Sequence, residues 1–321
     1  MIRVSRYLRV SALALLAAGL LLSNARPASA DDYYVGEQSH NGLFEVVNIL
    51  GSPQGEIYIH NSALDRQLVD ALGFGATLRS SPTYSPFTGK RYYLLNGGTI
   101  TQIGASNTRS TFATFTPPLG YVASFIASCG TATADKICIL FRSVNGCSSN
   151  KLRIGKISAG GSMTLGPEYG PFPNWCVRDM VSDQNGLKVM WQNTALQSHQ
   201  GVTIWRMDFN GVRQSIMASA IDFFGTAQAL APDTLHPDFV FALDIDIAQN
   251  VYSIKKINAV TGAATQMQFS QPPGTIVYDI AYYQTMNQLV MIGTIPSTHE
   301  YVLTTIAEDL QNLFQQRTFG N

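Results

Sequence analysis

The amino-acid sequence predicts an all-β fold, a six-bladed β-propeller of four-stranded antiparallel blades. One observation is a strand-and-turn unit that recurs with starts near residues 57, 100, 152, 203, 252 and 301, in steps of 43, 52, 51, 49 and 49 residues. A second observation is a turn signal upstream of each unit. Four short strands cannot bury both faces of their sheet alone, so repeats of this period are expected to pack radially.

The clearest unit lies in the fifth repeat, where Phe239–Leu243, Val251–Ile257 and Ala264–Phe269 are rich in β-branched and aromatic residues. Gly262 marks the tight turn before the last of these strands. The upstream turn signals are Asn41-Gly42, Thr88-Gly89, Thr133–Asp135, Asn185-Gly186, His236-Pro237 and Met286-Asn287. A β-sandwich or a parallel solenoid is the alternative, but a sandwich has no reason to keep a four-strand period.

Two segments carry a family resemblance. Tyr84–Leu95 contains Tyr-Ser-Pro-Phe-Thr-Gly, and Ile257–Gly262 reads Ile-Asn-Ala-Val-Thr-Gly. Both resemble the turns of secreted bacterial β-propeller repeat proteins of the YVTN/WD-like or NHL-like kind, with no specific subfamily. The resemblance implies a propeller fold over the whole mature chain and implies no particular activity.

Residues 1–30 are predicted to form a signal peptide, which leaves residues 31–321 as a single propeller domain. Arg3, Arg6 and Arg9 precede an apolar run from Val10 to Leu22, and Ala28–Ala30 supplies small residues for cleavage. The alternative is an uncleaved anchor, but the run is shorter than the ~20 residues of a membrane span. The protein is therefore expected to be exported, to the periplasm or the exterior, with no membrane span.

The charge of the mature chain excludes nucleic acid as a partner. The signal peptide holds four arginines and no acids, which leaves 21 − 4 = 17 basic residues against 21 acidic ones. Binding to a phosphate backbone needs clustered Lys and Arg, and the sequence has no such cluster.

The four cysteines are expected to form two disulfides, because an even count in an exported chain is typical of disulfide pairing. Their spacing does not fit the close pairs of a zinc site. The repeat map places Cys129 and Cys138 on one hairpin, and Cys147 and Cys176 on the opposite rim in neighbouring blades. We therefore predict the pairs Cys129–Cys138 and Cys147–Cys176.

A ligand site is predicted on the face formed by the connections between blades and by the loops between the second and third strands, called the top face below. The longest such loops belong to the third and fourth repeats and are rich in aromatic residues. Gathered rings could stack on a glycan or anchor a peptide. The alternative is that each ring packs between blades. The candidate residues are Tyr169, Phe172, Trp175, Trp191, His199, Phe223 and Phe224.

A second candidate is a polar ring at the channel mouth, obtained by aligning the starts of the innermost strands. Two carboxylates beside hydroxyl and amide groups could hold Ca²⁺. Hydrogen bonding from one blade to the next is the alternative, and no other cofactor is predicted. The ring residues are Ser81, Ser124, Asp179, Gln228 and Asp279.

The sequence favours a non-catalytic binding module that uses the top face, as a monomer, for a glycan or a protein or peptide ligand. It contains no G-x-S-x-G and no H-E-x-x-H motif. Two alternatives stay open: a propeller hydrolase or lyase acting on a saccharide or lactone, and a structural component of an envelope complex. An enzyme would require titratable groups that converge in a pocket.

Overall fold

The computed structural model describes residues 82–320, except 96, 105, 107, 196–200, 218–225, 247–248, 296 and 299. Before residue 82 it describes the backbone of four strands: β1 (Asp32–Gln38), β2 (Gly42–Asn48), β3 (Gly55–His60) and β4 (Arg66–Ala71). The predicted signal peptide, residues 1–30, lies outside the described residues.

From Thr83 onward the chain forms antiparallel sheets of four strands, each sheet in sequence order. The first contains β5 (Thr83–Tyr84), β6 (Arg91–Leu95), β7 (Thr99–Ile103) and β8 (Arg109–Thr114). The second contains β9 (Tyr121–Ser128), β10 (Lys136–Ser143), β11 (Asn150–Ser158) and β12 (Met163–Phe172), with the short 3-10 helix η2 (Gly146–Ser149) between β10 and β11.

The remaining sheets follow the same plan. One contains β13 (Trp175–Asp183), β14 (Gly186–Asn193), β15 (Val202–Met207) and β16 (Arg213–Met217). The next contains β17 (Thr226–Pro232), β18 (Phe239–Asp246), β19 (Val251–Asn258) and β20 (Ala264–Ser270). The last contains β21 (Ile276–Tyr283), η3 (Gln284–Met286), β22 (Gln288–Ile295), β23 (Glu300–Ala307) and β24 (Leu313–Gly320).

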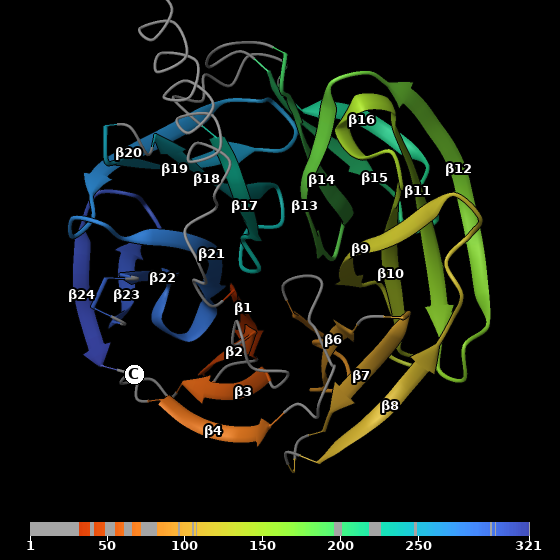
Figure 1. The fold of residues 1–321 in the computed structure, drawn as a ribbon, viewed down its shortest axis with the longest axis horizontal. Helices are drawn as coiled ribbons and strands as arrows, with labels where there is room; N and C mark the ends of the chain where they lie inside the picture. The colour runs from red at the N-terminus through yellow and green to blue at the C-terminus, as the bar shows by residue number, and fades with distance from the viewer. Residues whose placement is uncertain are drawn as a thin grey trace, which may run out of the picture.

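The sheets surround a central axis as the blades of a β-propeller, with β9, β13, β17 and β21 innermost and β8, β12, β20 and β24 outermost (Figure 1). Neighbouring inner strands lie side by side: β13 contacts β9 and β17, and β17 also contacts β21. The outer strand of the final blade is β24, which follows Asn312 and pairs with β23.

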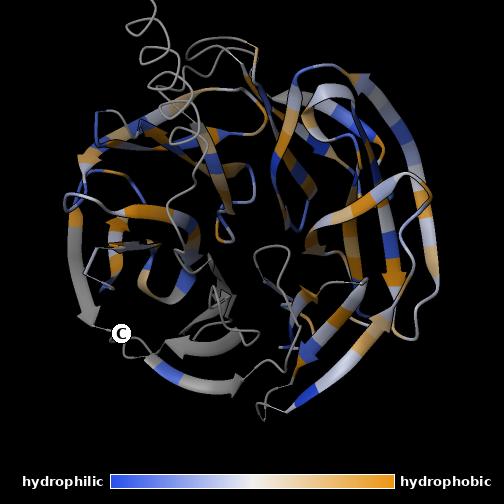
Figure 2. Cartoon of the chain, viewed as in Figure 1, coloured by the Kyte–Doolittle hydropathy of each residue, from blue (hydrophilic) through white to orange (hydrophobic). Residues whose placement is uncertain are grey.

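Apolar layers between adjacent blades form the core. One cluster joins the blades of β5–β8 and β9–β12, and others join each following pair around the ring. Apolar residues recur along the strands of these blades (Figure 2). The three blades between β9 and β20 therefore bury both faces against their neighbours, as expected for a repeat that cannot form a core alone.

The predicted count of six blades is corrected by the structure to five. The five blades from β5 to β24 have described strands, side chains and shared apolar layers, which are what stabilise a blade. For the segment before β5, only the strand pairing is described. Its strands pair in the order β1-β2-β3-β4, and the backbone of β1 lies beside β21 and β5. The structure therefore describes five blades that share apolar layers, where the sequence predicts six.

Both predicted disulfide pairs are confirmed. Cys129 and Cys138 bridge β9 and β10 beside their hairpin, with Cα atoms 5.7 Å apart. Cys147 in η2 and Cys176 in β13 join adjacent blades, with Cα atoms 4.7 Å apart. Within the described part of the chain, no helix is long and apolar enough to cross a bilayer.

Candidate binding site on the top face

Four inner strands have a β-bulge at the same place. In each, one extra residue interrupts the pairing with the second strand of the blade: Ser124 in β9, Arg178 in β13, Gln228 in β17 and Tyr278 in β21. Bulges redirect side chains and are common beside functional sites. The repeat thus places one polar side chain per blade on the innermost strand near the top face.

Three of the bulge residues bond to the second strand of their own blade. Arg142 Nε donates to Ser124 Oγ at 2.8 Å. Arg178 Nε donates to Gln192 Oε1 at 2.8 Å, and the Tyr278 hydroxyl lies 3.4 Å from Thr294 Oγ1. These contacts fix the orientation of the side chains, and for both arginines they occupy Nε.

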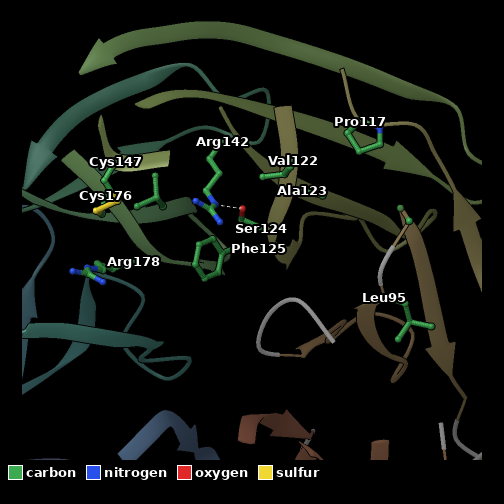
Figure 3. Close-up of a pocket in the computed structure, with 13 residues that line it drawn as sticks. Leu95, Pro117, Val122, Ala123, Ser124, Phe125, Arg142, Cys147, Cys176 and Arg178 are labelled. Atoms are coloured by element: carbon green, nitrogen blue, oxygen red, sulfur yellow. Dashed lines mark hydrogen bonds between the residues drawn. A yellow bond between two sulfur atoms is a disulfide. The ribbon is translucent and has the colours of Figure 1, made fainter. Parts of the chain in front are cut away.

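A cavity of about 490 Å³ opens beside Ser124 and Arg178 (Figure 3). Its volume is in the range that holds a small organic ligand. Its walls come from the blades of β5–β8, β9–β12 and β13–β16, and the Cys147–Cys176 disulfide forms part of one side. Lining it are Leu95, Gly97, Gly98, Pro117, Val122, Ala123, Ser124, Phe125, Arg142, Cys147, Cys176, Val177 and Arg178.

The two glycines belong to the turn between β6 and β7. Gly98 has φ +80°, and a Cβ atom there would stand 2.2 Å from the Phe115 carbonyl oxygen. Only glycine fits so close an approach. The turn can therefore lie against Phe115 and serve as one wall of the cavity.

The cavity is electropositive. Both guanidinium groups are half-buried, and among the described residues neither Arg142 nor Arg178 forms an ion pair with an acid. Burial lowers the pKa of Arg178, which is the electrostatic cost of removing its charge from water. Arginine nevertheless stays charged, so an incoming anion would offset that cost.

The predicted channel ring is divided by the bulge. Ser124 and Gln228 occupy bulge positions, whereas Asp179 and Asp279 lie one residue further along their strands and are buried. Ser124 lines the cavity. Ser81 lies outside the described residues.

Asp179 joins two blades. Its Oδ1 accepts from the Met180 N–H at 2.7 Å, and its Oδ2 accepts from the Leu230 N–H of the next blade, also at 2.7 Å. Asp279 Oδ1 accepts from the Ile280 N–H at 2.9 Å. Both carboxyl groups thus accept backbone hydrogen bonds, and the one from Leu230 to Asp179 supports the blade-to-blade alternative over calcium ligation at that position.

Several of the predicted aromatic residues pack in the core between blades. Phe172 and Tyr169 are on β12, which continues where a loop was expected, and their rings lie 5.7 and 5.5 Å from Trp205. Trp191, 1% exposed, lies 4.9 Å from Trp205. Half-buried Trp175 packs against the same cluster and precedes the cavity residue Cys176. His199, Phe223 and Phe224 lie outside the described residues.

Sequence reasoning missed Arg142, Arg178 and Trp205. The signal for Arg178 was present, because it directly precedes Asp179 in the aligned inner strands. An alignment by sequence alone treats the strand as regularly paired, and it places Asp179 in the channel ring because a carboxylate fits a cation site. The bulge that places Arg178 at the cavity and buries Asp179 depends on the pairing of β13 with β14, which a sequence alignment does not contain.

A separate cluster lies at the other end of the blades, where Asp233, His236 and Glu308 come within reach of a shared metal ion. The Lys256 ammonium already pairs with Glu308 and lies 3.4 Å from Asp233 Oδ2. A cation is therefore in place between the carboxylates, and the group acts as an ion-pair network between two blades.

Comparisons with known proteins identify the fold class, that of β-propellers. AofleA from Arthrobotrys oligospora is similar over 92% of this chain and 87% of its own, with 10% identity and a TM-score of 0.59. A protein from Lactobacillus plantarum is similar over 91% and 86%, with 14% identity and a TM-score of 0.53. An oligogalacturonate lyase from Vibrio parahaemolyticus is similar over 90% and 76%, with 9% identity and a TM-score of 0.52.

At these identities the likeness concerns the fold alone. No known protein family matches the sequence, and no curated protein matches it. The YVTN/WD-like or NHL-like repeat type expected from the sequence is therefore not confirmed.

Proposed function

We propose that this protein is a non-catalytic binding module that holds an anionic ligand in the top-face cavity. The observation that carries the proposal is the pair of guanidinium groups, Arg142 and Arg178, on one cavity without an acidic partner among the described residues. Each donates a hydrogen bond through Nε to a neighbour, and its outer nitrogens are the groups that would bind a carboxylate or phosphate.

The chemistry of the lining supports binding without catalysis. Among the described residues that line the cavity, none is a carboxylic acid or a histidine. General acid–base catalysis needs such a group within hydrogen-bond reach of the substrate. The cavity instead combines two fixed cations with apolar walls, which is the usual composition of a recognition site.

The same proposal includes export of the protein and a role for Trp175 at the rim of the cavity. Residues 1–30 act as a signal peptide and the remaining chain works as one exported domain, for which the two disulfides are suitable. Trp175 is proposed as a rim residue because it adjoins Cys176. The roles expected for His199, Phe223 and Phe224 stay predictions from the sequence.

The test is a calorimetric titration of the disulfide-bonded protein with paired acids and neutral analogues: uronic-acid oligosaccharides against neutral ones, and N-acetylated amino acids against their amides. We expect at least one acid to bind and its neutral analogue to bind far more weakly. Arg142→Gln and Arg178→Gln should each weaken binding by about tenfold or more, since a hydrogen bond to a charged group contributes roughly 1.5–3 kcal/mol.

Arg109→Gln is the matched control, because Arg109 is exposed on the outer strand β8. Near-ultraviolet circular dichroism shows whether each variant keeps its packed aromatic core. Affinity that is unchanged in both cavity variants, or equal affinity for acid and neutral analogue, would refute the proposed function.

A further inference from the structure

The cavity has two chemically different parts. Apolar walls are supplied by Leu95, Pro117, Val122, Phe125 and Val177, and the cationic part by the two arginines. A ligand that fills both parts must carry an anion next to an apolar group. A saccharide acid has hydroxyl groups around its ring, and their burial against these walls without partners would cost free energy.

An exposed apolar rim adjoins this cavity. Leu119 is fully exposed and Val144 is 61% exposed, and their loops are joined by a hydrogen bond of 3.0 Å from the Val144 N–H to the Gly120 carbonyl. Pro117 and Val122, on either side of Leu119 in the sequence, both line the cavity. The apolar surface therefore continues from the cavity walls onto the top face.

The charge of the cavity also restricts which ligand group can lie next to the anion. A free amino acid carries an α-ammonium group beside its carboxylate, and the described lining offers two guanidinium groups and no carboxylate to receive it. Like charges this close repel each other. When the nitrogen is part of an amide, as in a peptide bond, it carries no charge.

We propose that the ligand is the carboxyl terminus of a peptide or protein with an apolar last side chain. The terminal carboxylate binds the outer nitrogens of Arg142 and Arg178. The last side chain packs against Val122, Phe125 and Val177, and the preceding residues leave the cavity across Leu119 and Val144. This inference rests on the proposed function and names the class of ligand for the same site.

The test measures the binding of labelled tetrapeptides to the full disulfide-bonded protein by fluorescence anisotropy. The probe ends in leucine with a free carboxylate, and its partners are the same peptide as a carboxyl-terminal amide, the same peptide ending in aspartate, and a galacturonic acid trisaccharide. We expect the leucine carboxylate to bind at least about tenfold more tightly than the amide, since the charged hydrogen bonds are lost.

Three variants locate the interaction. Arg178→Gln and Arg142→Lys should weaken the binding of the carboxylate peptide and leave the weak binding of the amide unchanged. Glutamine removes the charge, whereas lysine keeps the charge but loses the planar fork of the guanidinium group. Leu119→Asp should weaken a tetrapeptide more than N-acetyl-leucine, which does not reach the rim. Leu235→Asp, at an exposed leucine in the β17–β18 connection, is the matched control.

The outcomes separate the two proposals. If the galacturonic acid trisaccharide binds in an arginine-dependent way and the peptides do not, the carboxyl-terminal ligand is wrong and the anion-binding function stands. If the leucine peptide and its amide bind equally, the carboxyl-terminal ligand is also wrong. If no acid binds, or binding does not depend on either arginine, the proposed function itself is wrong.

Discussion

At the scale of single residues, one position along a strand separates a structural side chain from a cavity side chain. Arg178 and Asp179 are adjacent, yet the bulge in β13 places Arg178 at the cavity and buries Asp179 in hydrogen bonds between blades. Sequence spacing predicted positions that lie at or beside the bulge in each of these inner strands. It could not place the bulge, because a bulge is a property of the pairing between two strands.

The buried carboxyl of Asp179 gives a prediction for the pH dependence of stability. Burial raises the pKa of Asp179 to about 7, while the backbone hydrogen bonds from Leu230 and Met180 lower it in part. In the unfolded chain the pKa returns to about 4. The stabilising contribution is fully present below pH about 4, and it is lost as the pH rises through about 7, because only the folded state still holds the proton between these values.

We therefore expect the free energy of unfolding in urea, followed by tryptophan fluorescence, to fall between pH 4 and pH 7. Asp179→Asn, which cannot titrate, should flatten this fall, whereas Asp309→Asn at an exposed position should keep it. Parallel pH profiles for wild type and Asp179→Asn would contradict the assignment.

At the scale of elements, the structure explains why several of the predicted aromatic residues pack between blades. The segment around Tyr169 and Phe172 contains prolines and glycines and was expected to be a loop, but it pairs with β11 as the long outer strand β12. Its rings then face the neighbouring blade and meet Trp205. Tertiary pairing overrides the local turn signals here. The cysteine pairing could be predicted because it depends only on which end of a strand each residue occupies.

The two disulfides should have different effects on binding. Replacement of Cys147 and Cys176 by serine opens a loop with a sequence separation of 29, which the chain-entropy argument values at about 3–4 kcal/mol. It also frees one wall of the cavity, so ligand affinity should fall. Replacement of Cys129 and Cys138 removes a bridge with a separation of 9, which is worth about 2.5 kcal/mol, and should leave affinity unchanged.

Urea unfolding and peptide titration of the two double variants check this expectation. Equal loss of affinity in both variants would show that the disulfides act on the fold as a whole. An unchanged affinity in the Cys147/Cys176 variant would show that this disulfide does not contribute to the binding site.

At the scale of the whole molecule, the propeller brings together residues far apart in the sequence. Leu95, Phe125, Arg142 and Arg178 come from the first or second strands of three consecutive blades, and together they line one cavity (Figure 3). The repeat period predicted this architecture, although the number of blades with a described core is five. The cavity itself could not be predicted, because it depends on how unlike side chains of neighbouring blades fill the channel mouth.

The most direct measurement is a crystal structure of the protein with N-acetyl-4-bromophenylalanine, an acid with an apolar side chain, a neutral amide and an anomalous scatterer. The account predicts a bromine peak in the cavity between β9 and β13, with the carboxylate against Arg142 and Arg178 and no peak in the Arg178→Gln variant. A bromine peak against the Tyr169–Trp205 cluster or elsewhere in the channel, with the cavity empty, would contradict it.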